Sequence, residues 1–210
     1  MSEVTSVKEW LRMWDKDYER LRLVKIHNDL VKEYNETYRY YHNLNHISSC
    51  LSDFFNAFDL AINPFEVWLA LWFHDSVYDP HRRDNEEQSA MYLDKAIKGL
   101  VGNTMLNRIT ELILATKHSE EPNNRDMKLI MDVDLAILGK TTYEFKQYEK
   151  NIRREYEWLS WEKYSRGREI VLRNFLERDC IYHTGYFREK YETKARSNLI
   201  NSIKKLKGMN

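Results

Sequence analysis

Residues that form turns are scarce in this sequence, which contains six glycines and three prolines among 210 residues. In average proteins the two together make up roughly 12% of residues. A β-sandwich or barrel needs a turn about every 8 to 12 residues, so this composition excludes both classes. We therefore predict an all-α protein in which long helices are joined by few loops.

The composition contains enough hydrophobic residues for a core and has no net charge. Hydrophobic residues make up 42% of the chain and aromatic residues 13%, which is typical of a globular protein and not of a disordered one. The 33 basic residues balance the 33 acidic ones exactly in number, giving a formal net charge of zero. A nucleic acid or an anionic membrane is therefore not expected as the main partner, and any anion must be bound by local charges.

The sequence also indicates a cellular compartment. Two cysteines, Cys50 and Cys180, cannot form a disulfide framework, and the first residues lack the pattern of a signal peptide. The longest apolar run, residues 67–73, is far shorter than the roughly 20 residues that span a bilayer. We predict a cytoplasmic protein without a membrane segment.

Hydrophobic residues recur at helical spacing along most of the chain. The first such segment covers residues 7–21. Asn63 and Pro64 are typical of a helix start, and the run at 67–73 that follows them is apolar on all sides. We expect this helix to lie at the centre of the protein.

The later segments complete the predicted architecture. A helix is expected over residues 126–138, with Gly139 as its C-terminal cap. Further helices follow, with interruptions expected near residues 165–167 and 183–185. Because no repeat, linker or shift in composition is present, we predict one domain over residues 1–210, built as a bundle of nine or ten helices.

The dipeptide His74-Asp75 ends the predicted central helix. As a two-residue motif it has little specificity, but an ionised aspartate at the end of an apolar helix is costly unless it is paired or bound to a cation. An imidazole beside a carboxylate suits a divalent metal. The alternative is an exposed helix-end aspartate beside a histidine of the core.

Two further segments offer ligands. His46 lies upstream in the first turn of a predicted helix, and Asp132 and Asp134 lie downstream in an otherwise apolar helix. Residues two apart on a helix point in different directions, so these two aspartates cannot both face one metal. We predict Asp134 as the ligand because its neighbours on the same face are apolar, and Asp132 remains the alternative.

These residues and the sequence segments around them resemble those of the HD-domain superfamily of phosphohydrolases. The resemblance is greatest to the subfamily described as predicted metal-dependent HD phosphohydrolases. The phrases that carry the resemblance span most of the chain: RYYHNLNHI, FHDSVYDP, DNEEQSA, ATKH, MDVDLAILG and RREY. The resemblance implies an HD-type helical bundle and a metal site formed by His46, His74, Asp75 and Asp134.

The resemblance also implies a function. The expected reaction is hydrolysis of a phosphoester of a small molecule by a metal-activated water, and a nucleotide is the favoured substrate. Ligation by nitrogen and oxygen fits Mn²⁺, Co²⁺, Ni²⁺, Fe²⁺ or Zn²⁺, whereas Mg²⁺ is less natural beside two imidazoles. One metal ion is the favoured prediction, and a second metal ion is the alternative. A homodimer also stays open.

Basic groups must meet the charge of a phosphate. Arg39 is the best placed in the sequence, followed by Lys117 and Arg154, and His42 lies four residues before His46. Each of these four residues is a predicted substrate contact. The structural alternative is a surface side chain or an ion pair for the cations, and packing among tyrosines for His42.

We expect Asp75 to be catalytic as well as a metal ligand. Glu86 and His118 complete the predicted catalytic residues. Glu86, by resemblance, is a general acid or a residue that orients water, and its alternative role is to favour the dipole of a helix start. His118 is placed to contact phosphate or to hold a second metal.

Other functional classes are weaker. A catalytically inactive module of the same fold that binds a metal or a nucleotide is the main alternative. A di-iron bundle needs paired Glu-x-x-His elements, and no glutamate here has a histidine three residues later. The zincin spacing His-Glu-x-x-His is also absent.

Overall fold

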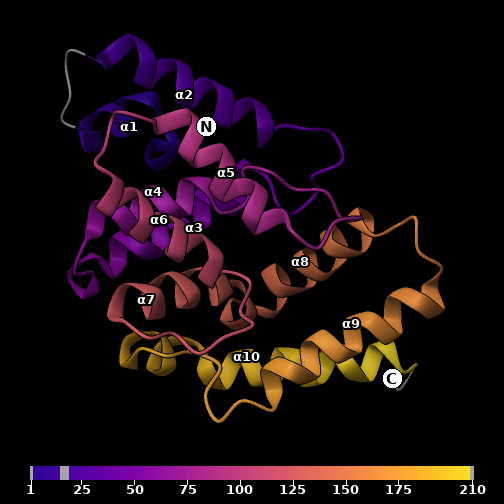
Figure 1. Cartoon of the computed structure of the whole chain (residues 1–210). Coiled ribbons are helices and arrows are strands. Elements are labelled where there is room, and N and C mark those ends of the chain that lie inside the picture. The colour runs from indigo at the N-terminus through magenta and orange to yellow at the C-terminus, as the bar shows by residue number, and fades with distance from the viewer. Residues whose placement is uncertain (1, 15–18, 209–210) are drawn as a thin grey trace. The chain divides into compact units, whose positions relative to one another are not determined.

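The computed structural model describes residues 2–14 and 19–208 of the chain. Within them the chain forms ten α-helices and no strand, so the predicted all-α class is confirmed (Figure 1). The helices are α1 (Val7–Trp14), α2 (Arg20–Glu33), α3 (Leu44–Asn56), α4 (Pro64–Phe73), α5 (Asn85–Ile97), α6 (Asn103–Ala115), α7 (Arg125–Asp134), α8 (Thr142–Glu155), α9 (Trp161–Leu176) and α10 (Gly185–Leu206). Short 3₁₀ helices are η1 (Glu3–Thr5), η3 (Phe58–Leu60) and η4 (Leu135–Gly139).

The chain divides into two compact units, Met1–Ile130 and Met131–Asn210. The division falls within α7, and each unit is described by itself below. The single domain predicted from the sequence stays a prediction. None of the helices in the described part of the chain combines the length and the apolar character needed to cross a bilayer.

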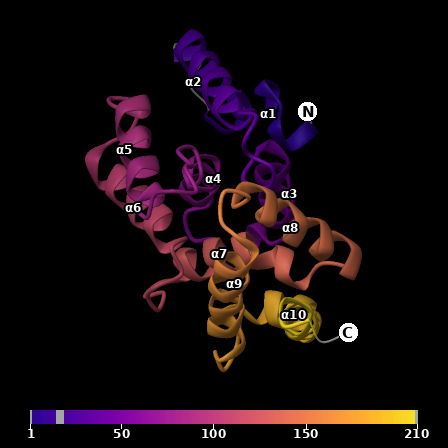
Figure 2. The same cartoon turned by 90° about the vertical axis from the view of Figure 1, so that its right-hand side faces the viewer.

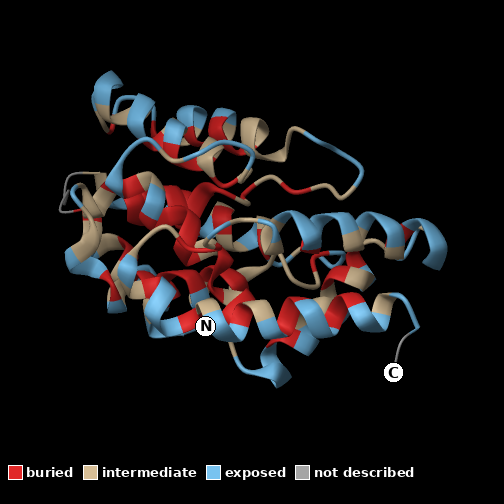
Figure 3. Cartoon of the chain, turned by 90° about the horizontal axis from the view of Figure 1, so that it is seen from below, coloured by how far each residue is buried: buried red, intermediate tan, exposed pale blue. Residues whose placement is uncertain are grey.

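The central helix of the first unit is α4. It begins as predicted, with Asn63 before it and Pro64 at its first position. Every residue from Glu66 to Phe73 is buried, because α3, α5 and α6 all pack against this helix. Figure 2 shows α4 between α3 on one side and α5 and α6 on the other, and Figure 3 shows buried residues on the inward faces of the helices.

Four tryptophans fill the core around α4. The ring of Trp10 lies 5.0 Å from that of Trp68 and 5.4 Å from that of Trp72, measured between centroids. Trp14 lies 5.7 Å from Trp10 and belongs to the same cluster. The indole nitrogen of Trp10 donates to the carbonyl of Leu23 at 2.9 Å, which joins α1 to α2. The segment predicted as one helix over residues 7–21 contains the whole of α1 and the first residues of α2, and residues 15–18 between them lie outside the described residues.

The sequence predicts two helix breaks in the second unit, and the structure contains one of them. The break expected at residues 165–167 is absent, because α9 runs through Gly167 without interruption. Nothing lies within 4 Å of a Cβ added at this glycine, so its place in the helix costs about 1 kcal/mol of helix propensity and nothing in packing. The break expected at residues 183–185 is present, since α10 begins at Gly185.

Gly139 has a different role from the predicted helix cap. α7 ends at Asp134, and η4 continues to Gly139, whose backbone is not in the left-handed region that a capping glycine adopts. A Cβ at this position would lie 2.9 Å from the carbonyl oxygen of Tyr191 on α10. The glycine is therefore explained by the close approach of two backbones within the second unit.

Candidate metal centre

His46 lies in the first turn of α3. Asn43 caps this helix, with its side-chain oxygen accepting a hydrogen bond from the backbone nitrogen of Asn45 at 2.9 Å. The same amide donates to the carbonyls of Arg39 and Tyr40. The loop before α3 is therefore fixed to the helix start, and the imidazole of His46 is held in a buried position.

His74 and Asp75 follow directly after α4. The backbone nitrogen of His74 continues the helical pattern by donating to the carbonyl of Ala70 at 2.8 Å. Its ring nitrogen Nδ1 lies 2.9 Å from the carbonyl of Leu71. Because a carbonyl can only accept, Nδ1 carries the proton, and a neutral His74 presents the lone pair of Nε2. This arrangement orients the ring as is usual for a metal-binding histidine.

Three donor atoms of the first unit converge at one point. Nε2 of His46 lies 3.2 Å from Nε2 of His74. Oδ2 of Asp75 lies 3.3 Å from Nε2 of His46 and 3.1 Å from Nε2 of His74. Ligands about 2.1 Å from one ion lie about 3.0 Å apart at right angles and about 3.4 Å apart at tetrahedral angles. These residues could therefore hold one divalent ion.

The count of protons supports the same conclusion. His74 contributes no proton to this group when neutral, since its N–H points to Leu71. A neutral His46 brings at most one proton on Nε2, and that nitrogen faces two acceptors, Nε2 of His74 and Oδ2 of Asp75. A divalent cation satisfies all three atoms at once, so the donor set fits a metal of the types expected.

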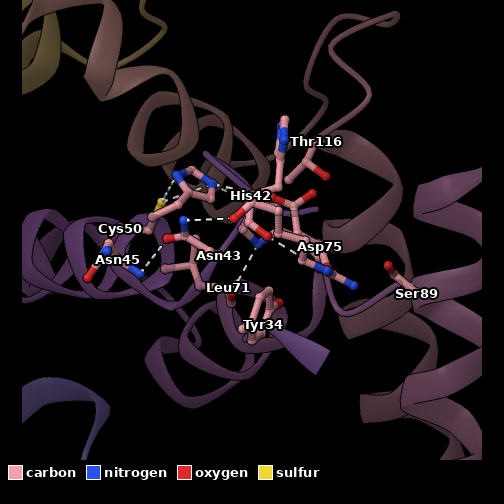
Figure 4. Close-up of polar contacts among 12 residues, drawn as sticks. Tyr34, His42, Asn43, Asn45, Cys50, Leu71, Asp75, Ser89 and Thr116 are labelled. Atoms are coloured by element: carbon pink, nitrogen blue, oxygen red, sulfur yellow. Dashed lines mark hydrogen bonds and ion pairs between the residues drawn. The ribbon is translucent and has the colours of Figure 1, made fainter. Parts of the chain in front are cut away.

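The electrostatic surroundings of Asp75 favour its ionised form. Burial would raise the pKa of its carboxyl, but when the imidazoles around it are protonated, the charges of His74 and His42 and hydrogen bonds from His46 and His74 hold that pKa well below its usual range. Figure 4 shows Asp75 and His42 close together, with Cys50 and Asn45 on the α3 side of the cluster. An ionised carboxylate is the form that binds a metal.

Cys50 is a neighbour of the site that sequence reasoning missed. Its Sγ lies 3.6 Å from Nδ1 and 3.7 Å from Nε2 of His46. Because these distances are nearly equal, neither ring nitrogen is singled out as the partner of the sulfur. The spacing of four residues on a predicted helix could have revealed this contact.

Arg39, a predicted substrate contact, has its guanidinium engaged by backbone carbonyls. Its Nη1 donates to the carbonyl of Asp75 at 2.6 Å, and its Nη2 donates to the carbonyl of Ser76 at 3.0 Å. The side chain is 1% exposed. These bonds favour a structural role for the guanidinium over contact with phosphate.

His42 lies beside the metal ligands. Its ring stacks on Tyr78 with centroids 4.0 Å apart and planes 24° from parallel, and its centroid lies 6.1 Å from that of His46. The packing against a tyrosine that the sequence left as an alternative is thus present. The half-buried ring also stays a predicted substrate contact.

Glu86 and Lys117 lie on neighbouring elements of the first unit. Glu86 is in the first turn of α5, where burial raises the pKa of its carboxyl, its own backbone amide lowers it, and the negative charge of Asp75 raises it again. The net effect is a raised pKa, as a proton donor requires. Lys117, a predicted phosphate contact, follows α6. Its ammonium forms an ion pair with the carboxylate of Glu87.

His118 stands directly after Lys117 in an unusual backbone conformation. Its φ is 55°, which places a residue other than glycine in the left-handed region. Thr116, two residues earlier, is buried and donates to the carbonyl of Ile113 at 2.7 Å. His118 thus adopts a conformation that few residues other than glycine take, and its role as a catalytic residue stays a prediction.

The remaining predicted residues lie in the second unit. Asp132 is fully buried, and its carboxylate accepts hydrogen bonds at 2.7 Å from the backbone nitrogens of His183 and Thr184 and from the hydroxyl of Thr184. It therefore anchors the start of α10, a structural role that weighs against it as a ligand. Asp134 is the half-buried last residue of α7, and Arg154 is exposed on α8. Their predicted roles stay predictions.

The structure thus brings together His46, His74 and Asp75, three of the four predicted metal ligands, within one unit. Comparison of the chain with models of protein families, with curated proteins and with solved structures finds no match. The chemistry of the site therefore rests on the geometry of these side chains.

Proposed function

We propose that this protein is a metal-dependent phosphohydrolase that cleaves a phosphoester of a small molecule, with a nucleotide as the favoured substrate. The observation that carries the proposal is the convergence of His46 Nε2, His74 Nε2 and Asp75 Oδ2 within 3.1 to 3.3 Å of one another. The resemblance of the surrounding phrases to HD-domain phosphohydrolases supplies the reaction class.

The metal ligands would be His46, His74 and Asp75, and Asp134 stays the fourth ligand predicted from the sequence. When bound, a divalent ion supplies a Lewis acid that polarises a phosphoryl oxygen and lowers the pKa of water. Two imidazoles and a carboxylate favour Mn²⁺, Co²⁺, Ni²⁺, Fe²⁺ or Zn²⁺. The hydrogen bond from Nδ1 of His74 to Leu71 keeps that ring in the tautomer needed for ligation.

Residues around the ligands would handle protons and charge. Glu86, whose pKa is raised chiefly by burial, can hold a proton closer to neutral pH than an exposed glutamate and give it to a leaving group. His42 and His118 are histidines that can donate hydrogen bonds to phosphate oxygens. Lys117 would first have to leave Glu87, so we expect its contribution to be smaller.

The test begins with metal analysis of the purified protein by mass spectrometry. The protein is then stripped with EDTA, reloaded with Mn²⁺ or Co²⁺, and assayed for phosphate release from a panel of nucleotides and other phosphoesters. We expect release that depends on the metal and is abolished by EDTA. Asp75→Ala should lose both metal and activity. Asp94→Ala, an exposed aspartate on α5, is the control that should retain both.

Two results would contradict the proposal. Full activity of Asp75→Ala would remove the metal site from the reaction. Tight binding of metal and nucleotide without hydrolysis across the panel would instead support a catalytically inactive binding module. The same metal analysis tests the fourth ligand, because Asp134→Ala is expected to lose metal whereas Asp132→Ala is expected to keep it.

A further inference from the structure

The guanidinium of Arg39 is buried among hydrogen-bond acceptors and tyrosine rings. In addition to the carbonyls of Asp75 and Ser76, it donates from Nη1 to the carbonyl of His42 at 3.3 Å and from Nε to Oε2 of Glu36 at 2.9 Å. The tyrosine rings of Tyr34 and Tyr78 lie 5.4 Å and 5.8 Å from its central carbon. Four of its five N–H donors are thus accounted for within the protein.

These bonds connect the two segments that carry the metal ligands. The backbone carbonyl of Arg39 accepts from the side chain of Asn43, the residue that caps α3 just before His46. The side chain of Arg39 crosses to the carbonyl of Asp75, a residue 36 positions away in sequence. One residue therefore joins the start of α3 to the turn after α4, where His74 and Asp75 lie.

Only a guanidinium can make this set of contacts. Its planar fork presents donors in fixed directions, so carbonyls of separate segments are held at fixed positions relative to one another. A lysine ammonium is a single charged point on a flexible stem and could reach one or two of these acceptors, leaving the others buried without a donor.

We propose that Arg39 is a positioning residue of the metal site, which holds His46 and Asp75 at ligand distance by clamping the turn after α4 to the start of α3. The inference rests on the proposed function, because it assumes that a metal binds between these residues. It also gives Arg39 a role that differs from contact with phosphate.

The test measures Co²⁺ binding, which reports the site without any substrate. Wild-type protein and Arg39→Lys are stripped of metal and titrated with Co²⁺, and the affinity and the visible absorption spectrum are recorded. Loss of a group that orients metal ligands typically weakens binding by about 10- to 100-fold. We expect a loss of this size in Arg39→Lys, with a changed spectrum, while circular dichroism shows a folded protein.

A matched control separates positioning from general stability. Arg168 is a second enclosed arginine, 9% exposed, which pairs with Glu149 within the second unit. Arg168→Lys should lower thermal stability without changing the affinity or spectrum of Co²⁺. In addition, ethylguanidinium in solution should restore part of the Co²⁺ affinity of Arg39→Ala, because it can donate the hydrogen bonds of the missing guanidinium.

The outcomes distinguish the two proposals. If wild-type protein binds no Co²⁺, the proposed function fails. If wild-type protein binds Co²⁺ and folded Arg39→Lys binds it with the same affinity and spectrum, the positioning role of Arg39 is overturned while the proposed function stands. Should Arg39→Lys not fold, Glu36→Ala decides, since it removes one partner of the guanidinium at a half-exposed position. We expect weaker Co²⁺ binding in this variant, and unchanged binding would overturn the inference.

Discussion

Asp75 in the first unit and Asp132 in the second are both aspartates near the end of an apolar helix, yet their carboxylates face different groups. Asp75 faces the imidazoles of His46 and His74, and together with His42 these hold its pKa well below the usual range against the effect of burial. Asp132 faces two backbone amides and a hydroxyl. Burial raises its pKa to about 6, and hydrogen bonds from Thr184 and His183 lower it only in part.

The difference shows what distinguishes a candidate ligand from a structural acid. Both residues are aspartates near the end of an apolar helix, so residue type and position do not separate them. The neighbours do, because titratable imidazoles can share a cation with the carboxylate, whereas amides only satisfy its lone pairs. Four experiments follow: the first three test the contrast between Asp75 and Asp132 directly, and the fourth tests a carboxylate beside the candidate metal site.

The largest expected effect is the loss of the metal site in Asp75→Asn. The amide removes the charged ligand with little change in shape, so we expect no bound Mn²⁺ or Co²⁺ and a fall in phosphate release of at least about 1000-fold, which corresponds to about 4 kcal/mol of the activation barrier. Asp132→Asn should keep its metal and most of its activity. Metal analysis and the phosphate-release assay measure both variants, and equal losses in the two would erase the contrast.

The next effect concerns the stability of the second unit. Asp132→Ala leaves two part-buried amides and a hydroxyl without their acceptor, and each such group costs about 1 to 3 kcal/mol when it is shielded from water. We expect the free energy of unfolding to fall by about 4 kcal/mol, measured by urea denaturation followed by circular dichroism. Asp179→Ala, an exposed aspartate of the same unit, is the control and should change it by less than about 0.5 kcal/mol. A small effect of Asp132→Ala would mean that water replaces the carboxylate.

The pH dependence of stability gives a somewhat smaller effect with a definite sign. Because the pKa of Asp132 is raised to about 6 in the folded protein, its contribution is fully present below the unfolded pKa of about 3.9 and is lost as the pH rises through 6. The free energy of unfolding of the wild type, minus that of Asp132→Asn, should fall by about 2 kcal/mol between pH 4 and pH 7. Urea denaturation across this range measures it.

A flat difference across this range would show that the three hydrogen bonds stabilise the ionised carboxylate as well as water does. A rising difference would reverse the assignment and make Asp132 resemble Asp75, whose lowered pKa contributes stability above its unfolded pKa that is lost on acidification.

The smallest expected change is in Glu87→Gln, which tests a neighbour of the site. This variant removes the ion pair with Lys117, a half-exposed contact worth about 1 kcal/mol or less. Stability should therefore change little, whereas release of Lys117 should lower the KM for a phosphorylated substrate about two- to fivefold if the cation meets phosphate. An unchanged KM would leave Lys117 as a partner of Glu87 alone.

Much of the helical architecture could be predicted from the sequence. The scarcity of glycine and proline, the apolar run in α4 and the start at Asn63 and Pro64 all act locally, so their consequences appear in the order of residues. The break before α10 was predicted for the same reason. Gly167 was misleading because a helix tolerates a glycine at a modest cost when its surroundings are otherwise helical.

The roles of individual side chains were harder to predict. An arginine near two histidines suggests a phosphate contact, but its partners are backbone carbonyls from a segment 36 residues away, and carbonyls leave no pattern in a sequence. Gly139 was predicted as a cap because the usual reason for a glycine is its backbone angle. Its actual reason is the close approach of Tyr191, which depends on how η4 and α10 pack.

The distribution of the six tryptophans gives the protein two built-in optical probes. Four of them, Trp10, Trp14, Trp68 and Trp72, are buried in the core of the first unit, whereas Trp158 and Trp161 in the second unit are about half exposed. Enclosed indoles emit at shorter wavelengths than hydrated ones and are shielded from iodide. Unfolding of the first unit should therefore shift the emission to the red, while iodide quenches chiefly the second unit's fluorescence in the native protein, so one unlabelled sample reports on the two halves separately.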